Sequence, residues 1–144
     1  MNPHPWLVRK RNEDVGKGVI TALLVLVGAW AAAPALAEES GVARGVYATG
    51  IQEREPTGLV TVLPKDSERV YFYTELRNLA GQTVTHRWQH GGQTVLEIPF
   101  EVKAARWRVW SSKEIQPGVT GELTVLVVDG NGKELMRAVL PVGP

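Results

Sequence analysis

The sequence predicts an all-β fold: an immunoglobulin-like antiparallel β-sandwich of seven to eight strands over residues 45–144, preceded by an N-terminal signal helix. Beyond residue 44, apolar side chains recur with a period near two, which is typical of strands with one buried face. Turn-forming residues interrupt this alternation about every ten residues, as they do in sandwiches and barrels of short strands. The segment has the length of one such domain and is too short for two.

Eight strands follow from the alternation and from the turn residues between them. They are predicted at residues 46–52, 59–63, 69–77, 83–89, 94–102, 107–111, 122–129 and 134–140. The turn sequences Gly91-Gly92 and Gly130-Asn131-Gly132 indicate hairpins, because these residues tolerate the positive φ angles of tight turns. Pro99 donates no ladder hydrogen bond, which predicts that its strand lies at a sheet edge or carries a bulge. Residues 123–128 are apolar on both faces, which indicates a central strand.

The cost of burying charge orients two of these strands. Burying two unpaired guanidinium groups costs several kcal/mol each, whereas leaving a Trp partly in water forfeits roughly 2–3 kcal/mol. Trp107 and Val109 are therefore predicted to face the core. Their neighbours on the outer face are Arg106, Arg108 and Trp110. The same test divides residues 69–77 into an inward row and an outward row. The inward row is Val70, Phe72, Thr74 and Leu76, and the outward row is Tyr71, Tyr73 and Glu75.

Residues 1–37 have the parts of a secretory signal peptide. A basic leader precedes an apolar run at 19–33, and Ala35-Leu36-Ala37 forms a small-residue cleavage site. The apolar run has 15 residues, fewer than the roughly 20 that a transmembrane helix needs. We expect cleavage after Ala37 and a periplasmic or secreted protein, with residues 38–44 as a flexible lead-in. The alternative is a retained signal that anchors the chain in the inner membrane through residues 19–33, and membrane contact is expected only in that case.

The composition excludes several classes of function. The leader holds four of the 16 basic residues and two of the 15 acidic ones, so the exported part carries a net charge of −1. A nucleic-acid partner is not expected, because such binders show a clustered basic surface. The chain has no cysteine, which excludes disulfides, thiolate metal sites and cysteine catalysis. No cofactor or metal is expected, since His86 and His90 would stand about 13 Å apart in a regular strand, too far to share an ion.

The best candidate for a binding site is a set of side chains that mixes flat aromatic rings with arginines. Its members are Tyr71, Tyr73, Arg87, Arg106, Arg108 and Trp110. Aromatic faces stack on sugar rings, and the guanidinium fork binds carboxylates or phosphates through two hydrogen bonds. The set suits an acidic glycan or a protein partner of the cell envelope. The alternative is a purely structural role, because cross-strand pairs and Arg–Trp stacking stabilise an exposed sheet without any ligand.

No pattern of catalytic residues stands out. Ser111-Ser112-Lys113 could suggest a serine–lysine pair, but a nucleophile needs a base within about 3 Å and an oxyanion site. No glycine-rich elbow surrounds these serines, so we interpret them as residues of a strand end. We interpret His86 as a hydrogen-bonded, partly buried residue and His90 as a turn residue. An enzyme is therefore the remotest alternative.

Several sequence blocks, two of which contain tryptophan, carry a family resemblance. They are Arg69-Val70-Tyr71-Phe72, Thr83-Val84-Thr85-His86-Arg87-Trp88, Pro99-Phe100-Glu101-Val102, Arg106-Trp107-Arg108-Val109-Trp110-Ser111-Ser112-Lys113 and the final hairpin around Gly130. Their order and spacing are similar to the core signature of the bacterial domain of unknown function 2914 family, over about residues 44–141. The resemblance implies a small envelope-associated β domain and no established activity or site residues. We expect an exported, non-catalytic envelope domain that binds a protein or glycan through its arginine and aromatic residues. The alternative is a structural or accessory domain without a ligand.

Overall fold

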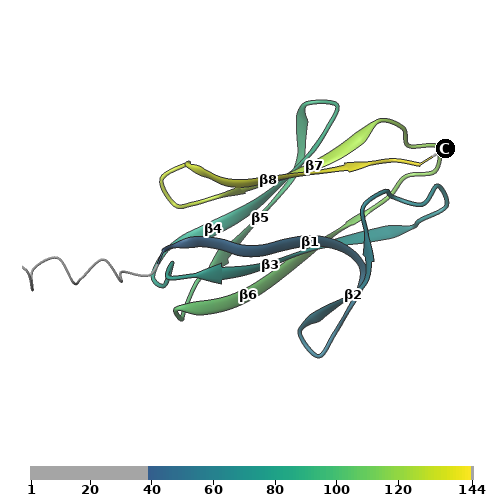
Figure 1. The fold of residues 1–144 in the computed structure, drawn as a ribbon. Coiled ribbons are helices and arrows are strands. Elements are labelled where there is room, and N and C mark those ends of the chain that lie inside the picture. Colours follow the sequence, from purple (N-terminus) through teal and green to yellow (C-terminus); the bar gives the residue numbers. More distant parts are fainter. Residues whose placement is uncertain (1–38, 144) are drawn as a thin grey trace, which may run out of the picture. The chain divides into compact units, whose positions relative to one another are not determined.

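The computed structural model describes residues 39–143, which form eight β-strands and no helix (Figure 1). The strands are β1 (Gly41–Gln52), β2 (Glu55–Val60), β3 (Arg69–Arg77), β4 (Thr83–His90), β5 (Gln93–Glu101), β6 (Arg106–Glu114), β7 (Glu122–Val128) and β8 (Glu134–Pro141). Each predicted strand overlaps one of these. The prediction of an all-β fold is therefore confirmed for this part of the chain.

The strands form two four-stranded sheets, which Figure 1 shows as two layers. Sheet I has the strand order β2-β1-β3-β6, and sheet II has the order β5-β4-β7-β8. Every strand pairing within the two sheets is antiparallel. The chain passes from sheet I to sheet II after β3, returns after β5 and passes over again after β6. The described residues thus form a β-sandwich in which each sheet has an inner and an outer face.

Apolar side chains from the two inner faces form the core. Phe72 on β3 and Trp88 on β4 are fully buried. Both lie against the ring of Tyr47 on β1, with ring centres 4.8 and 6.1 Å away. The Tyr47 hydroxyl donates a hydrogen bond of 2.7 Å to the carbonyl of Ala138 on β8, which joins sheet I to sheet II. Burial raises the pKa of Tyr47, so its hydroxyl keeps the proton that this bond requires.

Burial confirms the predicted orientation of β3 and β6. The inward row of β3 is completely buried. On β6, Trp107 lies opposite Leu76, and Val109 lies opposite Thr74. Residues directly opposite each other in an antiparallel pair share a face, so these two β6 side chains point into the core. The alternation along β6 then leaves its two arginines on the outer face of sheet I.

Two further features of sheet II agree with the sequence analysis. β5, which contains Pro99, is an edge strand, and β7 lies between β4 and β8 with nearly all of its side chains buried. The β4–β5 turn uses Gly91 and Gly92 with φ angles of 60° and 80°. The Asp129 carboxylate closes the β7–β8 turn by accepting two backbone hydrogen bonds of 2.9 Å. These local signals therefore identified both hairpins correctly.

The beginning of the domain differs from the prediction. β1 starts at Gly41, so residues 41–44, expected in a flexible lead-in, are part of a strand that pairs with β3. The next strand spans Glu55–Val60 instead of 59–63, and it follows β1 after the two-residue turn Glu53-Arg54. Both turn residues have positive φ angles, 51° and 64°. This backbone region costs a non-glycine residue roughly 1 kcal/mol, so the sequence gives no hint of a hairpin here.

The predicted signal peptide, its cleavage site at Ala37 and the alternative anchor at 19–33 lie outside the described residues. Across residues 39–143, no helix is long and apolar enough to cross a membrane. The boundary between leader and domain therefore stays a prediction from the sequence.

Candidate functional site

Five of the six candidate side chains lie on the outer face of sheet I. Tyr71 and Tyr73 belong to β3, and the other three belong to the neighbouring strand β6. In the register of these strands, Tyr73 lies opposite Trp110, and Glu75 lies opposite Arg108. We call the outer surface of β1, β3 and β6 the arginine face. It carries Arg44, Arg69, Tyr71, Tyr73, Glu75, Arg77, Arg106, Arg108, Trp110 and Glu114.

Arg87 does not belong to this face, so the prediction that it shares a site with the other five residues is wrong. It lies on β4 in sheet II, where its Nε atom donates a hydrogen bond of 3.0 Å to Glu97 on β5. The alternation along β4 correctly places Arg87 outward, between the buried residues His86 and Trp88. Alternation cannot tell which of two sheets a strand joins, and this is the physical reason for the error.

Tyr73 also differs from the prediction, because it is completely buried although it projects from the outer face. Its ring stacks on Trp110 with ring centres 6.4 Å apart and planes inclined by 14°. The guanidinium carbon of Arg44 lies over the Tyr73 ring, 5.8 Å from its centre. The Tyr73 hydroxyl has no hydrogen-bond partner among the described residues. Long neighbouring side chains therefore cover this tyrosine, a tertiary effect that strand periodicity does not reveal.

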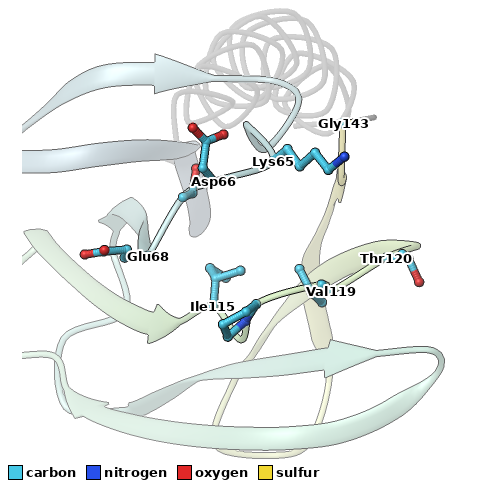
Figure 2. A pocket seen from close by; sticks show the side chains of 10 residues that line it. Lys65, Asp66, Glu68, Ile115, Val119, Thr120 and Gly143 are labelled. Atoms are coloured by element: carbon cyan, nitrogen blue, oxygen red, sulfur yellow. The ribbon is translucent and has the colours of Figure 1, made fainter.

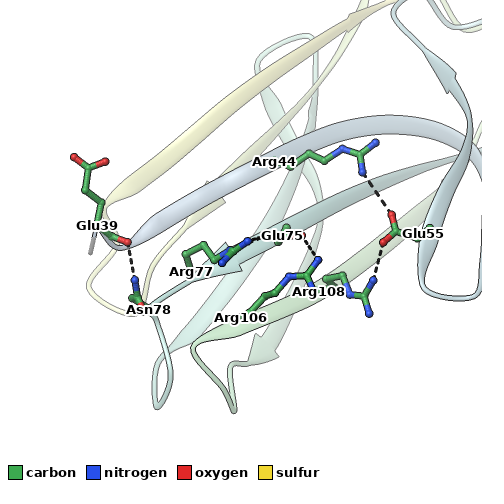
Figure 3. Close-up of polar contacts among 8 residues, drawn as sticks. All are labelled: Glu39, Arg44, Glu55, Glu75, Arg77, Asn78, Arg106 and Arg108. Atoms are coloured by element: carbon green, nitrogen blue, oxygen red, sulfur yellow. Dashed lines mark hydrogen bonds and ion pairs between the residues drawn. The ribbon is translucent and has the colours of Figure 1, made fainter. Parts of the chain in front are cut away.

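Glu75 binds two arginines at one end of the arginine face (Figure 3). Its carboxylate lies 3.0 Å from Arg106 and 2.7 Å from Arg77. The hydrogen bond from Arg106 is the main cause that holds the pKa of Glu75 below its usual range. Glu75 is thus ionised at neutral pH, and each of its two carboxylate oxygens already binds an arginine.

Glu55 binds a second pair of arginines, and it reaches them from β2 (Figure 3). One carboxylate oxygen accepts a hydrogen bond of 2.7 Å from Arg108 on β6, and the other lies 3.5 Å from Arg44 on β1. Since β3 lies between β1 and β6, this bridge crosses the middle of the arginine face. Sequence reasoning missed both Glu55 and Arg44, because the prediction had no hairpin that could bring β2 beside β1.

The arginine face has more positive than negative groups. Its five arginines bind three carboxylates: Glu75 and Glu114 of the face itself, and Glu55, which reaches it from β2. Glu114 binds Arg69 at 2.9 Å. Each guanidinium has five N–H donors, so donors remain for a further anion. Exposed ion pairs contribute only about 0–1 kcal/mol each, and a ligand carboxylate can replace the partner of one at small cost. The face can therefore bind anions.

A buried polar cluster connects the two sheets, and part of it was predicted incorrectly. Ser111, interpreted as a strand-end residue, is 5% exposed and contacts His86 Nδ1 at 2.8 Å and Trp88 Nε1 at 2.9 Å. The other ring nitrogen of His86 lies 3.0 Å from the Thr74 hydroxyl, which is 3.4 Å from the carbonyl of Val109. His86 is fully buried, which exceeds the partial burial expected for it.

One arrangement of hydrogens satisfies all of these contacts. The Trp88 indole N–H donates to Ser111, whose hydroxyl donates to Nδ1 of His86. The Nε2–H group of His86 then donates to Thr74, which donates to Val109. His86 must be neutral in this arrangement, and burial lowers its pKa to about 3. Although a serine lies beside a histidine here, the pair is sealed in the core and offers no site for a substrate.

A cavity of about 620 Å³ lies at one end of the sandwich (Figure 2). Lys65 and Asp66 line it from the β2–β3 connection, and Ile115 and Val119 line it from the β6–β7 connection. None of the candidate residues reaches it. The arginine face therefore remains the better candidate site.

A comparison with known protein families finds a match to part of the chain. The family described as protein of unknown function (DUF2914) matches residues 81–139, which include β4 to β7 and most of β8. The matched range contains three residues of the predicted set on the arginine face, all on β6, as well as the buried pair His86 and Ser111. No curated protein matches the chain. The resemblance noted in the sequence is thereby confirmed over residues 81–139, which are similar to the DUF2914 family of proteins of unknown function.

Proposed function

We propose that this protein is an exported, non-catalytic domain of the cell envelope that binds an acidic glycan or protein through the arginine face. The observation that supports this function most is the charge ratio of five arginines to three carboxylates. Trp110 lies on the same face, and its half-buried ring offers a flat apolar surface to a ligand. Arginines and an aromatic ring together suit a ligand with carboxylates and a partly apolar body.

The strand order supports an immunoglobulin-like sandwich as the scaffold. β1, β3 and β6 take the places of strands A, B and E, and β5, β4, β7 and β8 take those of C′, C, F and G. β2 is an addition at the edge of the first sheet. Sandwiches of this kind commonly serve as binding modules, and the signal-like sequence of residues 1–37 supports their placement outside the cytoplasm.

The geometry favours a non-catalytic function. Among the described residues, the serine and histidine that lie within hydrogen-bond distance of each other are both buried, so a substrate cannot reach them. The carboxylates of the arginine face bind guanidinium groups of the same chain, and the hydrogen bond from Arg106 lowers the pKa of Glu75, which makes Glu75 a poor proton donor to a substrate.

A structural role without a ligand is the second candidate, and a specific observation favours it. Tyr73 is fully buried, and Glu55 and Glu75 each bind two arginines within the chain. Such contacts stabilise the outer face of sheet I whether or not a ligand exists. The two functions predict different results when a single arginine is removed. A binding function predicts weaker retention of the protein on its ligand, and a structural role predicts lower stability.

Arg108→Ala is expected to reduce retention of the protein on isolated peptidoglycan or membrane fractions by about tenfold, the effect of losing roughly 1.4 kcal/mol of binding free energy. The free energy of unfolding should fall by less than about 1 kcal/mol, because the ion pair with Glu55 is partly exposed to solvent. Trp110→Ala should lower retention in the same way. Retention is measured by co-sedimentation, and stability by thermal melting.

Arg87→Ala is the matched control, since Arg87 also forms one ion pair with a glutamate but lies on the outer face of sheet II. We expect its retention to stay within about twofold of the unmodified protein, a change of under 0.5 kcal/mol. Equal retention of all variants, with a lower melting temperature for Arg108→Ala and Trp110→Ala, would contradict binding and support the structural role.

A further inference from the structure

β6 forms one edge of sheet I, and this edge is regular over the whole strand (Figure 1). The other edge strands in the described part of the chain are interrupted: β2 contains Pro56, β5 contains Pro99, and β8 ends at Pro141. β6 has neither proline nor glycine, and it pairs with β3 over nine residues without a register shift. Prolines and irregular pairing protect sheet edges against the addition of a further strand. β6 has neither of these two protections.

The register of β6 shows which of its backbone groups point to the open edge. The Ile115 N–H donates to the carbonyl of Glu68 at 2.9 Å, and the Asn78 N–H donates to the carbonyl of Ala105 at 2.7 Å. Both contacts continue the β3–β6 register at its two ends. Bonded and non-bonded pairs alternate along an antiparallel ladder, so the odd-numbered residues of β6 bond to β3. The residues whose N–H and C=O groups point to the open edge are Arg106, Arg108, Trp110, Ser112 and Glu114.

The apolar side chains beside this edge are incompletely covered. Leu96, Ile98 and Phe100 on β5 lie opposite buried residues of β4 and so point into the sandwich, yet all three are only partly buried. Trp107 on β6 points inward and is also partly buried. A cavity of about 380 Å³, lined by Val95 and by the last two residues of β6, lies at one end of this region. The sandwich therefore exposes apolar surface between β5 and β6.

The packing of the two sheets places β5 beyond the edge of β6. His86 on β4 contacts both Thr74 on β3, at 3.0 Å, and Ser111 on β6, at 2.8 Å, so β4 lies across the core from these two strands. At the other side of the sandwich, the hydrogen bond from Tyr47 to Ala138 joins β1 to β8. β5, the neighbour of β4 away from β7, thus extends past β6. A strand added to β6 has β5 across from it. A second copy pairing through its own β6 would bring its β5 to the same place, which favours a single extended segment.

We infer that the open edge of β6 binds an extended segment of a partner protein in which acidic and apolar residues alternate. The segment pairs antiparallel with β6 and becomes a further strand of sheet I. Its acidic side chains bind Arg106 and Arg108, and its apolar side chains cover Trp107 and the inward row of β5. This inference rests on the proposed function and specifies the form of its protein ligand.

The alternation follows from the different surroundings of the two faces of an added strand. Residues directly opposite each other in an antiparallel pair share a face. Partner residues opposite Arg106 and Arg108 therefore lie on the arginine face, and the residues between them point toward β5. Each of these two arginines contacts a carboxylate of the chain through one nitrogen and retains further N–H donors. Main-chain hydrogen bonds supply the affinity of such strand addition, and the alternate side chains supply its specificity.

Amide hydrogen exchange of the full chain with the peptide Thr-Val-Thr-Val-Glu-Val-Glu tests the inference. Antiparallel pairing brings its two glutamates opposite the two arginines of β6. Without peptide, the amides of Arg108 and Trp110 are expected to exchange at least about tenfold faster than those of Val109 and Ser111, which bond to β3. With saturating peptide, the exchange of Arg108 and Trp110 is expected to slow at least about tenfold, while that of Val109 and Ser111 stays unchanged.

Ser112→Pro tests the same edge through affinity. The substitution removes an N–H group that points to the open edge and leaves the hydrogen bonds to β3 in place, so it is expected to weaken peptide binding about tenfold. Ser112→Ala is the matched control, because it keeps the N–H group and should bind within about twofold of the unmodified chain. Fluorescence anisotropy of a labelled peptide measures the affinities, and thermal melting checks that both variants fold. The exchange experiment decides alone if Ser112→Pro does not fold.

Two further ligands show what the edge recognises. The same peptide with lysine in place of both glutamates is expected to bind at least about tenfold more weakly. Hexagalacturonate, an acidic glycan, has carboxylates but no peptide backbone, so it should not slow the exchange of the edge amides. Equal affinity of the lysine peptide, or equal protection by hexagalacturonate, would overturn the inference.

The failure of this inference and that of the proposed function are distinguishable. If Arg108→Ala lowers envelope retention while the peptide protects no edge amide, the inference fails and the proposed function stands. Equal affinities of folded Ser112→Pro and Ser112→Ala also contradict strand addition alone. If Arg108→Ala leaves retention unchanged and the peptide does not bind, both fail.

Discussion

Lowering the pH from about 7.5 to about 5 is expected to reduce the free energy of unfolding by about 2 kcal/mol through His86 alone. The folded protein keeps this side chain neutral, because burial lowers its pKa to about 3 from the ordinary 6.5. The unfolded chain therefore takes up a proton as the pH falls below about 6.5, while the folded protein does not. Chemical denaturation at several pH values measures the effect.

The control for this prediction is His86→Gln, which lacks the titrating group. Its stability should be lower overall but should change less between these two pH values than that of the unmodified protein. Glu75 does not interfere, because its pKa is lowered by Arg106 from an ordinary value of 4.5. Its stabilising contribution is complete above that value and is lost only as the pH falls further. The same pH dependence in both proteins would show that His86 is accessible to protons.

Ser111→Ala is expected to lower the free energy of unfolding by about 2–4 kcal/mol, because two buried groups lose their partner at once. The Ser111 hydroxyl accepts from the Trp88 indole at 2.9 Å and donates to His86 at 2.8 Å. Neither partner can form a hydrogen bond with water instead, since both are fully buried. Each unsatisfied buried polar group costs about 1–3 kcal/mol. Equilibrium denaturation in urea measures the difference.

Ser112→Ala is the natural comparison, because it removes the same hydroxyl one residue further along β6. Ser112 projects from the opposite face and accepts a hydrogen bond of 2.7 Å from Arg69 at an exposed position. Its removal should cost less than about 0.5 kcal/mol, as is usual for surface substitutions. Similar losses for the two serines would contradict the account of the buried cluster.

Strand periodicity and the cost of burying charge were sufficient to predict most of the sandwich. The orientation of β6 followed from comparing a half-exposed Trp107 with a buried Arg108, and the structure confirms it. Pro99 identified an edge strand, and the glycines at 91 and 92 identified a hairpin. In each case one local physical constraint decided the outcome, and no tertiary contact was needed.

The errors arose where tertiary contacts override local signals. β2 was misplaced because Glu53 and Arg54 form a tight turn that their types disfavour, and ion pairs of Glu55 support it. Tyr73 was expected at the surface, but Arg44 and Trp110 cover it. Arg87 was assigned to the wrong surface because alternation gives the side of a strand and not its sheet. The structure thus places the predicted β6 residues together on the outer face of sheet I, and the prediction lacked their partners on β1 and β2.

Chemical-shift mapping of the backbone amides during titration with hexagalacturonate tests the central claim most directly, namely that the arginine face of sheet I is the binding surface. The account predicts shifts confined to β1, β3, β6 and the Glu53-Arg54 turn, with sheet II unchanged. Shifts centred on β4 and β5 around Arg87, or no saturable shifts at all, would contradict it.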